Sequence, residues 1–507
     1  MCIHTLEKYF LIPPFMFNEI CDCSKFSKQD MFLELSYDEL QRRNIEMKEK
    51  RLAGEDQESV RKFCFEQLEK EKGIKALSLC FTDLEGRMQI LDYDKNFLLD
   101  SYKNLTFDGS SIQGFTVLKE SDLRLQVDWL SMRWAPADIF GPGKVIAFAN
   151  ICDKDGSLYH SDFRSQLFKL CEDLRKDKGM IVNVAPEIEG FLLNGVDAEQ
   201  AFDERTGFSL VAVSSYFNCL PQDTLRIFID KMAEVQSALG FQNEKDHPEV
   251  APSQFEINYR YALALDAADQ IQLYKLTARQ IAKYMGMTAS FLPKPFPDLN
   301  GSGMHCNISL AKDSSNIFYD VGGKENLSEV AWQFVNGILE NAKDLCLVMN
   351  SSVNSYRRLD PNYEAPNEIK ISSVDRGSMV RIPIGNEKSA RIEVRTVAPD
   401  GNPYMCLFAL IKAGLAGIES GKGDPEKFLN IKDGKAEVLP NNIIEALKIF
   451  KPSEFMKEIL GEHNHKKYFD RKKHIAERSP RRLGTLVKNG EVLYHHEVYN
   501  QMLWSKF

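Results

Sequence analysis

The stretch NGSGMHCNISL (300–310) combines two glycines, a histidine and an asparagine with the alternating pattern of a β-strand. Glycine has no Cβ, so a ligand or another segment can approach its backbone closely. Alternate residues of a strand share a face, so His305, Asn307 and Ser309 are expected on one side of it. Taken alone, the stretch predicts a strand with a polar face, and its histidine could be a metal ligand, a base or a buried core residue.

Other strand-like stretches repeat this design of one apolar and one polar face. The polar faces are formed by Glu187 and Glu189 in PEIEGF (186–191), by Glu256, Asn258 and Arg260 in QFEINYR (254–260), and by Arg391, Glu393 and Arg395 in ARIEVRT (390–396). Either the charges of a half-exposed sheet face water, or the polar faces converge on one cavity. The second interpretation is favoured because these faces carry almost entirely Glu, His, Asn and Arg, whereas solvated strand faces usually carry Lys, Thr and Ser as well as Glu.

A convergent cavity of this composition predicts a particular chemistry. Clustered carboxylates repel one another unless cations bind, and oxygen ligands with one imidazole suit Mg²⁺ or Mn²⁺ better than zinc. Arginines in NSYRRLDPNYEAP (354–366) and SSVDRGSMVRIP (372–383) suit phosphate or carboxylate groups. Metals beside arginines favour phosphoryl transfer. Because the chain has no GxxxxGK[ST] motif, a nucleotide would have to bind through these metals and arginines.

Composition excludes several classes of protein. The 507 residues are 43% hydrophobic and 27% charged, which is typical of a globular protein with more than one domain. A net charge of -9 argues against a nucleic-acid partner. The 11 cysteines show no CxxC or zinc spacing, which fits reduced thiols. Without a clean signal peptide or a long apolar window, we expect a cytoplasmic protein with no membrane partner.

The chain divides into three predicted segments. Residues 1–57 are an N-terminal appendage, expected to be helical or partly disordered, in which 38–70 reads as a solvated helix or a pair of helices. Residues 58–160 form a small mixed domain that begins with a β-hairpin at 74–93. Residues 161–507 alternate helices and strands, with helices at 162–179 and 225–240 that end at a glycine.

A series of separated motifs resembles the type I glutamine synthetases, over roughly residues 60–507. The motifs are FDGSSIQGF (107–115), ESD (120–122), PEIEGFL (186–192), SSYF (214–217), EVAPSQFEI (249–257), NGSGMHCNISL (300–310), NSYRRLDPNYEAP (354–366), DRGSMVRIP (375–383) and ARIEVRTVAPDGNPY (390–404). The resemblance implies an α+β fold, with an N-terminal β-grasp domain and a larger catalytic domain whose curved antiparallel sheet is flanked by helices. It also implies a homo-oligomer, a dodecamer of two hexameric rings with active sites between subunits.

The resemblance further implies ATP-dependent ligation of ammonia to L-glutamate, which gives L-glutamine through γ-glutamyl phosphate. ATP would be the co-substrate, and two or more Mg²⁺ or Mn²⁺ ions the cofactors. Two alternatives are a ligase that joins glutamate to an organic amine, such as a polyamine or ethanolamine, and a non-catalytic member of the family. Asp108 and Asp122 together favour ammonium, and the presence of every expected metal ligand argues against the non-catalytic alternative.

Six metal ligands follow from the resemblance. One metal is assigned to Glu189, Glu249 and Glu256, and a second to Glu187, His305 and Glu393. Glu249 and Glu256 are seven positions apart, so strict alternation would place them on opposite faces. A loop or bulge through APSQ (251–254) must therefore intervene.

The other assignments also come from the resemblance. Asn300 and Gly301 would contact the amino-acid substrate, with Arg358 and Arg395 on its carboxylates. The catalytic residues would be Asp108, Glu364, Arg376 and Arg381, and the ammonium pocket would comprise Asp108, Tyr216 and Glu364. ATP would be bound by Asn307, Ser309, Arg376 and Lys388.

Two of these residues carry an open question. Asp108 in FDGSS could instead be a turn or capping residue. Asn307 stands where the family usually has a second histidine, near the phosphates, and this departure puts the handling of the nucleotide in doubt.

Overall fold

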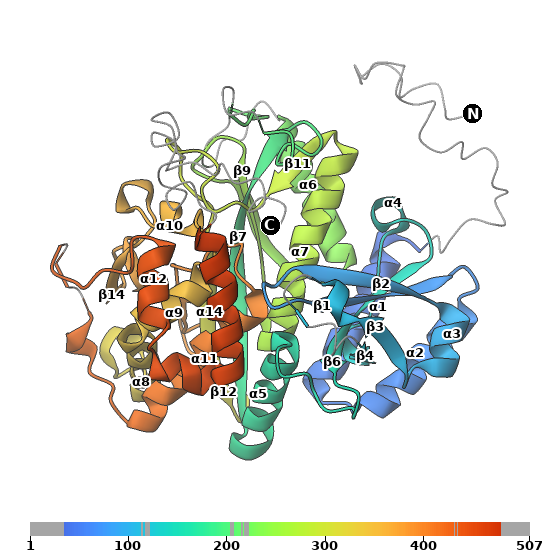
Figure 1. The fold of residues 1–507 in the computed structure, drawn as a ribbon, viewed down its shortest axis with the longest axis horizontal. Helices are drawn as coiled ribbons and strands as arrows, with labels where there is room; N and C mark the ends of the chain where they lie inside the picture. Colours follow the sequence, from blue (N-terminus) through green and yellow to red (C-terminus); the bar gives the residue numbers. More distant parts are fainter. Residues whose placement is uncertain are drawn as a thin grey trace.

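The computed structural model describes residues 35–112, 115–116, 122–202, 207–213, 216, 223–429, 431–432 and 434–477. These residues form two sheets and the helices around them, so the expected α+β class is confirmed (Figure 1). Most of the predicted appendage, residues 1–34, lies outside the described residues, as do Glu120 and Ser121 of the ESD motif and most of SSYF. The predicted boundaries after residues 57 and 160 stay predictions.

Two helices precede the first sheet, α1 (Tyr37–Ala53) and α2 (Gln57–Lys70), so the stretch at 38–70 is a pair of helices. Ser36 caps the start of α1, and Gly54 ends it in the left-handed region with φ of 72°. The buried Asn44 side chain donates hydrogen bonds to the carbonyls of Trp134 and Ala238. Because those carbonyls belong to distant parts of the chain, α1 is packed into the fold.

The first sheet has the strand order β2-β1-β6-β4-β3, and β5 pairs with β6. β1 and β2 are antiparallel and confirm the predicted hairpin, whereas β1 runs parallel to β6. The elements of this region are β1 (Ala76–Thr82), β2 (Met88–Asp94), α3 (Lys95–Ser101), β3 (Leu105–Asp108), β4 (Asp122–Val127), β5 (Arg133–Trp134), α4 (Ala137–Phe140) and β6 (Lys144–Cys152).

The second sheet has the order β14-β15-β16-β12-β7-β9-β8 and is antiparallel except for the pair β14 and β15. β10 and β11 also pair with β7, and β13 pairs with β12. Its strands are β7 (Met180–Asn194), β8 (Asn243–Pro248), β9 (Gln254–Tyr259), β10 (Ala262–Leu263), β11 (Met287–Ser290), β12 (Met304–Lys312), β13 (Ser315–Asn316), β14 (Glu368–Ser372), β15 (Ser378–Arg381) and β16 (Ile392–Val394).

The remaining α-helices belong to the part of the chain that carries the second sheet. They are α5 (Phe163–Lys178), α6 (Thr224–Ala238), α7 (Ala264–Tyr284), α8 (Glu329–Glu340), α9 (Ala342–Met349), α10 (Ser355–Arg358), α11 (Pro403–Ser420), α12 (Ile443–Phe450), α13 (Glu454–Leu460) and α14 (Glu462–Glu477). In Figure 1 the C-terminal helices, orange to red, lie on one side of β7, and the first sheet, blue, lies beyond α5 and α7 on the other. None of the described helices combines the length and apolar character of a membrane span.

One pair of helices packs unusually closely. A Cβ on Gly337 of α8 would lie 2.1 Å from the backbone oxygen of Ala413 on α11. A Cβ on Gly417 would meet the backbone oxygen of Gln333 at the same distance. Only glycine at both positions permits this approach.

The apolar faces of the second sheet belong to one large core. Ile188, Ile257, Ile308 and Ile392 are buried in this core, each from a different strand. Since side chains alternate along a strand, the residues beside them face the opposite side of the sheet. That opposite side carries the polar residues that the sequence singles out.

Candidate active site

Neighbouring strands bring the polar side chains into rows across the sheet. His305 on β12 is paired with Glu187 on β7, and Glu189 on β7 is paired with Glu256 on β9. Glu256 is also paired with His247 on β8. Residues paired across antiparallel strands have Cβ atoms about 5 Å apart, so these side chains adjoin one another.

A cavity of about 380 Å³ lies over this polar face. Glu256, His305 and Glu393 line it and are 5%, 5% and 1% exposed, so they do not face bulk water. The interpretation of convergent polar faces therefore describes the structure. The predicted residues that line the cavity are Glu187, Glu189, Tyr216, Glu249, Glu256, Asn300, Gly301, His305, Arg358, Glu364, Arg376, Arg381, Glu393 and Arg395.

One group of possible metal ligands comprises Glu187, His305 and Glu393, whose ligand atoms all lie within 4.8 Å of one another. His305 Nδ1 lies 3.5 Å from Glu187 Oε2 and 3.7 Å from Glu393 Oε1, and it is buried without a hydrogen-bond partner. Burial, and then the nearby Arg395, lower the pKa of His305 to about 3. The imidazole is therefore neutral, which is the form that binds a metal.

A second group comprises His247, Glu249 and Glu256. His247 Nδ1 lies 3.5 Å from Glu249 Oε1, and its Nε2 lies 3.8 Å from Glu256 Oε1. Glu189, which the resemblance assigns to this metal, lies with Oε1 at 3.9 Å from His305 Nε2. Glu189 thus lies beside the first group, and the structure adds His247, which the sequence reasoning missed although it precedes Glu249 by only two positions.

The turn between β8 and β9 explains how Glu249 and Glu256 meet. β8 ends at Pro248 and β9 begins at Gln254, so Glu249 lies in the connecting turn and Glu256 on the returning strand. The turn is closed by a hydrogen bond of 2.8 Å from the Glu249 N–H to the Gln254 carbonyl, and Ser253 adopts a positive φ of 64°. The predicted interruption through residues 251–254 is therefore the end of a hairpin.

Burial and crowding among carboxylates oppose the ionisation of Glu249 and Glu256. Burial, and then Glu189, raise the pKa of Glu249 to about 8. Burial, and then Glu187 and Glu189, raise the pKa of Glu256 well above its ordinary value. Divalent cations would relieve the repulsion among these carboxylates, and an oxygen-rich set with imidazole fits Mg²⁺ or Mn²⁺.

Affinity for Mg²⁺ is expected to increase with pH. A cation that binds at Glu249 must displace its proton below about pH 8, so the apparent affinity should rise by about tenfold per pH unit between pH 6 and 8. In the metal-free protein, the same raised pKa makes stability fall as pH rises from about 4.5 to about 8, since the native state then holds the proton more tightly than the unfolded chain.

Calorimetric titration of Mg²⁺ at pH 6, 7 and 8 checks this expectation. The variant Glu249→Gln is the control, because it should bind Mg²⁺ more weakly and with less dependence on pH. Equal affinity of the unmodified chain at pH 6 and pH 8 would contradict the proton displacement.

Guanidinium groups face the carboxylates across the cavity. Glu393 Oε2 accepts a hydrogen bond of 2.6 Å from Arg381 Nη1, and its Oε1 accepts one of 2.5 Å from Arg395 Nη1. Arg358 is 2% exposed, and its Nη2 donates to the Arg395 carbonyl at 2.8 Å. Arg376 and Arg391 also line the cavity, so five arginines face it.

The glycines of NGSGMHCN provide space within this arrangement. A Cβ on Gly303 would lie 2.4 Å from Arg358 Nη2 and 2.7 Å from His305 Nε2. A Cβ on Gly301 would lie 2.4 Å from the Pro293 carbonyl oxygen. The glycines therefore allow the backbone to run against both a guanidinium group and an imidazole ring.

A loop closes one side of the cavity. It follows α10 and a short 3₁₀ helix, Pro361–Tyr363, and it carries Glu364, which adopts a positive φ of 60°. Asn300 Nδ2 donates a hydrogen bond of 3.3 Å to Glu364 Oε2. The Tyr216 ring packs edge-on against the His247 ring, with centroids 5.2 Å apart.

Four predicted residues lie outside the lining of this cavity. Lys388 is exposed, and Ser309 is half-buried farther along β12. Asn307 accepts a hydrogen bond of 3.0 Å from Arg391 Nε, so it orients an arginine of the cavity. Asp108 is exposed, and its carboxylate accepts from the N–H and hydroxyl of Ser110, as expected for a capping residue.

Comparison with known proteins identifies the family. Residues 160–483 match the model described as glutamine synthetase, catalytic domain. A glutamine synthetase of Clostridium saccharobutylicum is 38% identical over 419 residues, which cover 79% of this chain and 91% of that protein. A glutamine synthetase of Staphylococcus aureus (strain Mu50 / ATCC 700699) is 36% identical over 436 residues, or 82% of this chain and 93% of that protein.

Solved structures share the fold. The structure of a GmaS/ADP complex has a TM-score of 0.73 and 26% identity, and the match covers 84% of this chain and 98% of that one. The electron cryomicroscopy structure of Plasmodium falciparum glutamine synthetase has a TM-score of 0.75 and 23% identity, and covers 86% of this chain and 98% of that one. The chain therefore belongs to the glutamine synthetase family of ligases.

Proposed function

We propose that the chain ligates ammonia to L-glutamate in an ATP-dependent reaction that gives L-glutamine through γ-glutamyl phosphate. The observation that carries this proposal is the cavity itself, in which two groups of metal-ligand residues adjoin five arginines. Such a site suits transfer of a highly charged phosphoryl group. Phosphoryl transfer to the side-chain carboxylate of glutamate would make that carboxylate reactive towards ammonia.

Arginines would hold the substrate and the transferred group. Arg358 and Arg395 would bind the carboxylates of glutamate, with Asn300 and Gly301 beside them, and Arg376 and Arg381 would face the phosphoryl group. A carboxylate is a poor electrophile because its leaving group would be oxide, and phosphorylation replaces that group with phosphate. When bound, two Mg²⁺ or Mn²⁺ ions would offset the negative charge of the phosphates.

A smaller cavity offers space for the rest of the nucleotide. It measures about 140 Å³ and shares Pro383, Ile384 and Arg391 with the larger cavity. ATP would span the two, with its phosphates towards Arg376 and near Asn307. The ADP of the GmaS/ADP complex supports a nucleotide as a ligand of this fold. The roles of Ser309 and Lys388 in binding ATP stay predictions.

The ammonium pocket would be completed by a second subunit. Glu364 and Tyr216 line the cavity of their own chain, whereas Asp108 does not. Hydrogen bonds from Ser110 and Ser111 lower the pKa of Asp108 and keep it anionic, which suits binding of a cation. We propose that Asp108 of an adjacent subunit faces Glu364 in a homo-oligomer, in keeping with the expected dodecamer, and accepts a proton from ammonium before the attack on γ-glutamyl phosphate. The cytoplasmic location stays a prediction.

Glu364 also lies on the loop that would cover the reacting groups. Its hydrogen bond to Asn300 joins this loop to the segment before β12 that carries Gly301. A closed loop would keep water from the acyl phosphate, whose hydrolysis would waste the ATP. Asn300 and Glu364 would thus link binding of glutamate to closure of the cavity.

The decisive assay compares nitrogen donors. The purified chain is incubated with ATP, Mg²⁺ and L-glutamate, together with ammonium, ethanolamine, a polyamine or no amine, and release of phosphate is measured. We expect release with ammonium to exceed that with either organic amine by at least about tenfold, because the carboxylates around the amine site favour a small cation. Glutamine should accumulate in step with phosphate.

The remaining outcomes distinguish the alternatives. Release of phosphate only with ethanolamine or the polyamine would instead establish a ligase for organic amines. Absence of turnover with every amine would favour the non-catalytic alternative. Release without any amine would show that water reaches the acyl phosphate, against the proposed closure of the loop.

A further inference from the structure

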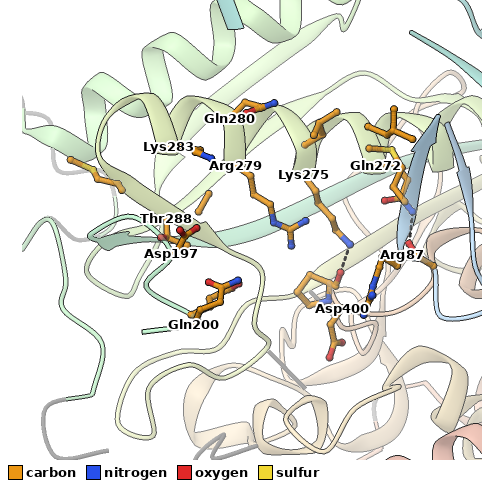
Figure 2. A pocket seen from close by; sticks show the side chains of 18 of the residues that line it. Arg87, Asp197, Gln200, Gln272, Lys275, Arg279, Gln280, Lys283, Thr288 and Asp400 are labelled. Atoms are coloured by element: carbon orange, nitrogen blue, oxygen red, sulfur yellow. Dashed lines mark hydrogen bonds between the residues drawn. The ribbon is translucent and has the colours of Figure 1, made fainter. Parts of the chain in front are cut away.

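A second cavity, of about 460 Å³, lies between the first sheet and helix α7. One wall is the β1–β2 turn with Arg87, and another is α7 with Lys275, Arg279 and Lys283. Figure 2 shows Lys275 and Arg279 projecting from α7 towards the segment that carries Asp400. The cavity has no residue in common with the lining of the proposed active site.

The cations on α7 form a regular row. Positions 275, 279 and 283 are four residues apart, so their side chains share one face of the helix. Arg87 approaches from the β1–β2 turn (Figure 2). Among the described residues, no carboxylate lies within ion-pair distance of any of these four cations. Lys275 Nζ donates to the Pro399 carbonyl, and Arg279 Nη2 is buried without a hydrogen-bond partner.

Most acids of this cavity are engaged elsewhere or lie at its rim. Glu85 is paired with Arg471 and Lys472 of α14, and Asp400 accepts hydrogen bonds from the Ser355 hydroxyl. Asp197 is exposed. None of these acids makes a direct ion pair with the four cations, although Asp400 attracts Lys275.

Like Asp400, Glu199 is an acid buried in the wall, and it attracts Arg279. It is 5% exposed, and its Oε1 has no hydrogen-bond partner. Burial raises the pKa of Glu199 to about 7, so near neutral pH a large share of this carboxyl carries a proton. In that form it can donate a hydrogen bond to an oxygen of an anion.

We propose that this cavity is a binding site for a small organic dianion, whose phosphate or carboxylate groups are held by Arg87, Lys275, Arg279 and Lys283. The volume is within the range of small-molecule sites. Two guanidinium groups can bind anionic oxygens in pairs, and the ammonium groups add point charges.

The position of the cavity connects it to the proposed active site. Pro399, Asp400 and Gly401 line it and follow β16, the strand that carries Glu393. Asp400 also accepts from Ser355, the first residue of the helix that ends with Arg358. An anion held by Lys275, whose Nζ donates to the Pro399 carbonyl, would thus lie close to a segment that is hydrogen-bonded to an element of the active site, so it could act as an effector.

Equilibrium dialysis of the full chain at low salt tests the site, with labelled inorganic phosphate in one arm and labelled succinate in the other. The test variant is Arg87→Gln with Lys283→Gln, because both side chains are exposed and their loss should not unfold the chain. Its control, Lys70→Gln with Lys154→Gln, removes two exposed cations elsewhere. The variant Arg376→Gln shows whether a probe binds in the proposed active site instead of in this cavity.

We expect at least one probe to bind at millimolar concentration or below, and the arm that binds shows whether phosphate or carboxylate groups are preferred. The test variant should weaken that binding by about tenfold or more, while the control and Arg376→Gln leave it unchanged. Three results would overturn the proposal: neither probe binds, the test variant binds as tightly as the control, or binding is lost in Arg376→Gln.

Discussion

Replacing Glu256 with glutamine is expected to stabilise the metal-free protein while it impairs metal binding and catalysis. Glu256 is buried between Glu189 and His247, and burial together with neighbouring carboxylates raises its pKa. Near pH 8 an uncharged amide avoids that repulsion, and one unit of pKa shift corresponds to about 1.4 kcal/mol. The free energy of unfolding without metal should therefore rise by at least about 1 kcal/mol.

With metal present, Glu256→Gln is expected to be unfavourable. The amide removes a charged ligand atom, so we expect the apparent affinity for Mg²⁺ to fall by about 100-fold and turnover at fixed Mg²⁺ to fall at least as far. Urea unfolding with and without Mg²⁺, combined with the glutamine-forming assay, measures both effects. Glu244→Gln is the matched control, because Glu244 is an exposed residue of the neighbouring strand, β8.

The Glu256 experiment has a clear contrary result. If Glu256→Gln is less stable than the unmodified chain without metal, the carboxylate makes a favourable contact that repulsion does not outweigh. If Mg²⁺ still stabilises the variant as much as the unmodified chain, Glu256 is not a ligand.

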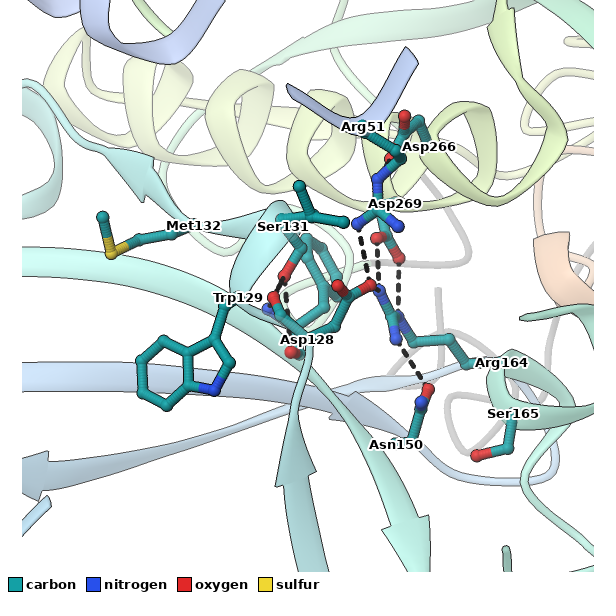
Figure 3. A network of polar contacts seen from close by, with 12 residues as sticks. Arg51, Asp128, Trp129, Ser131, Met132, Asn150, Arg164, Ser165, Asp266 and Asp269 are labelled. Carbon is teal, nitrogen blue, oxygen red and sulfur yellow. Dashed lines mark hydrogen bonds and ion pairs between the residues drawn. The ribbon is translucent and has the colours of Figure 1, made fainter. Parts of the chain in front are cut away.

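Replacing Arg164 with methionine should cause the largest loss of stability. Arg164 is fully buried at the start of α5, and its guanidinium bonds to Asp128, Asn150 and Asp269 at 2.7 to 2.9 Å (Figure 3). Arg51 of α1 is also paired with Asp128, at 2.8 Å. The network thus joins α1, the first sheet, α5 and α7.

The loss of stability expected for Arg164→Met follows from the acids that lose their partner. Burial opposes ionisation of Asp128, but Arg51 and Arg164 outweigh it and lower the pKa of Asp128. Without Arg164, the buried Asp128 and Asp269 lose the guanidinium that they share, so each must stay charged with less compensation or take up a proton. Breaking a buried ion pair on one side costs about 3–5 kcal/mol. We therefore expect a large fall in the urea midpoint of unfolding.

A control on the same helix shows how much stability is lost when an exposed positive charge is removed instead of a buried one. Lys176 is exposed on α5 and paired with Glu172 at 3.3 Å, so Lys176→Met should change stability by less than about 1 kcal/mol. Combining Arg164→Met with Asp269→Asn should recover part of the loss, because the second change removes a buried charge. Equal unfolding midpoints for Arg164→Met and Lys176→Met would contradict a stabilising role for the network.

Strand alternation accounts for the part of the site that could be predicted from the sequence. In β7, Ile188 enters the core while Glu187 and Glu189 line the cavity, and β16 repeats this with Glu393 beside Ile392. These strands follow a period of two because the sheet has one buried apolar face and one polar face. The pattern fixes the face but not which strands are neighbours.

The unpredicted parts depend on contacts between distant residues. Glu249 and Glu256 adjoin through a hairpin turn, which no periodicity within one strand reveals. α7 is buried on nearly every side although it carries polar residues such as Asp266, Gln270 and Lys275, so these residues do not mark a surface face of the helix. Asp108 is placed by the first sheet, away from the lining of its own chain's cavity, and its predicted role depends on a second subunit.

Anomalous scattering from crystals of the full chain grown with Mn²⁺ tests the central claim, a pair of dications in the polar cavity, most directly. We predict two peaks in that cavity, each about 2.0–2.4 Å from its ligand atoms. One should be held by Glu187, His305 and Glu393, and the other by Glu249 and Glu256 with His247 or Glu189. Absence of manganese from this cavity at millimolar Mn²⁺, with peaks only at other acidic side chains, would contradict the claim.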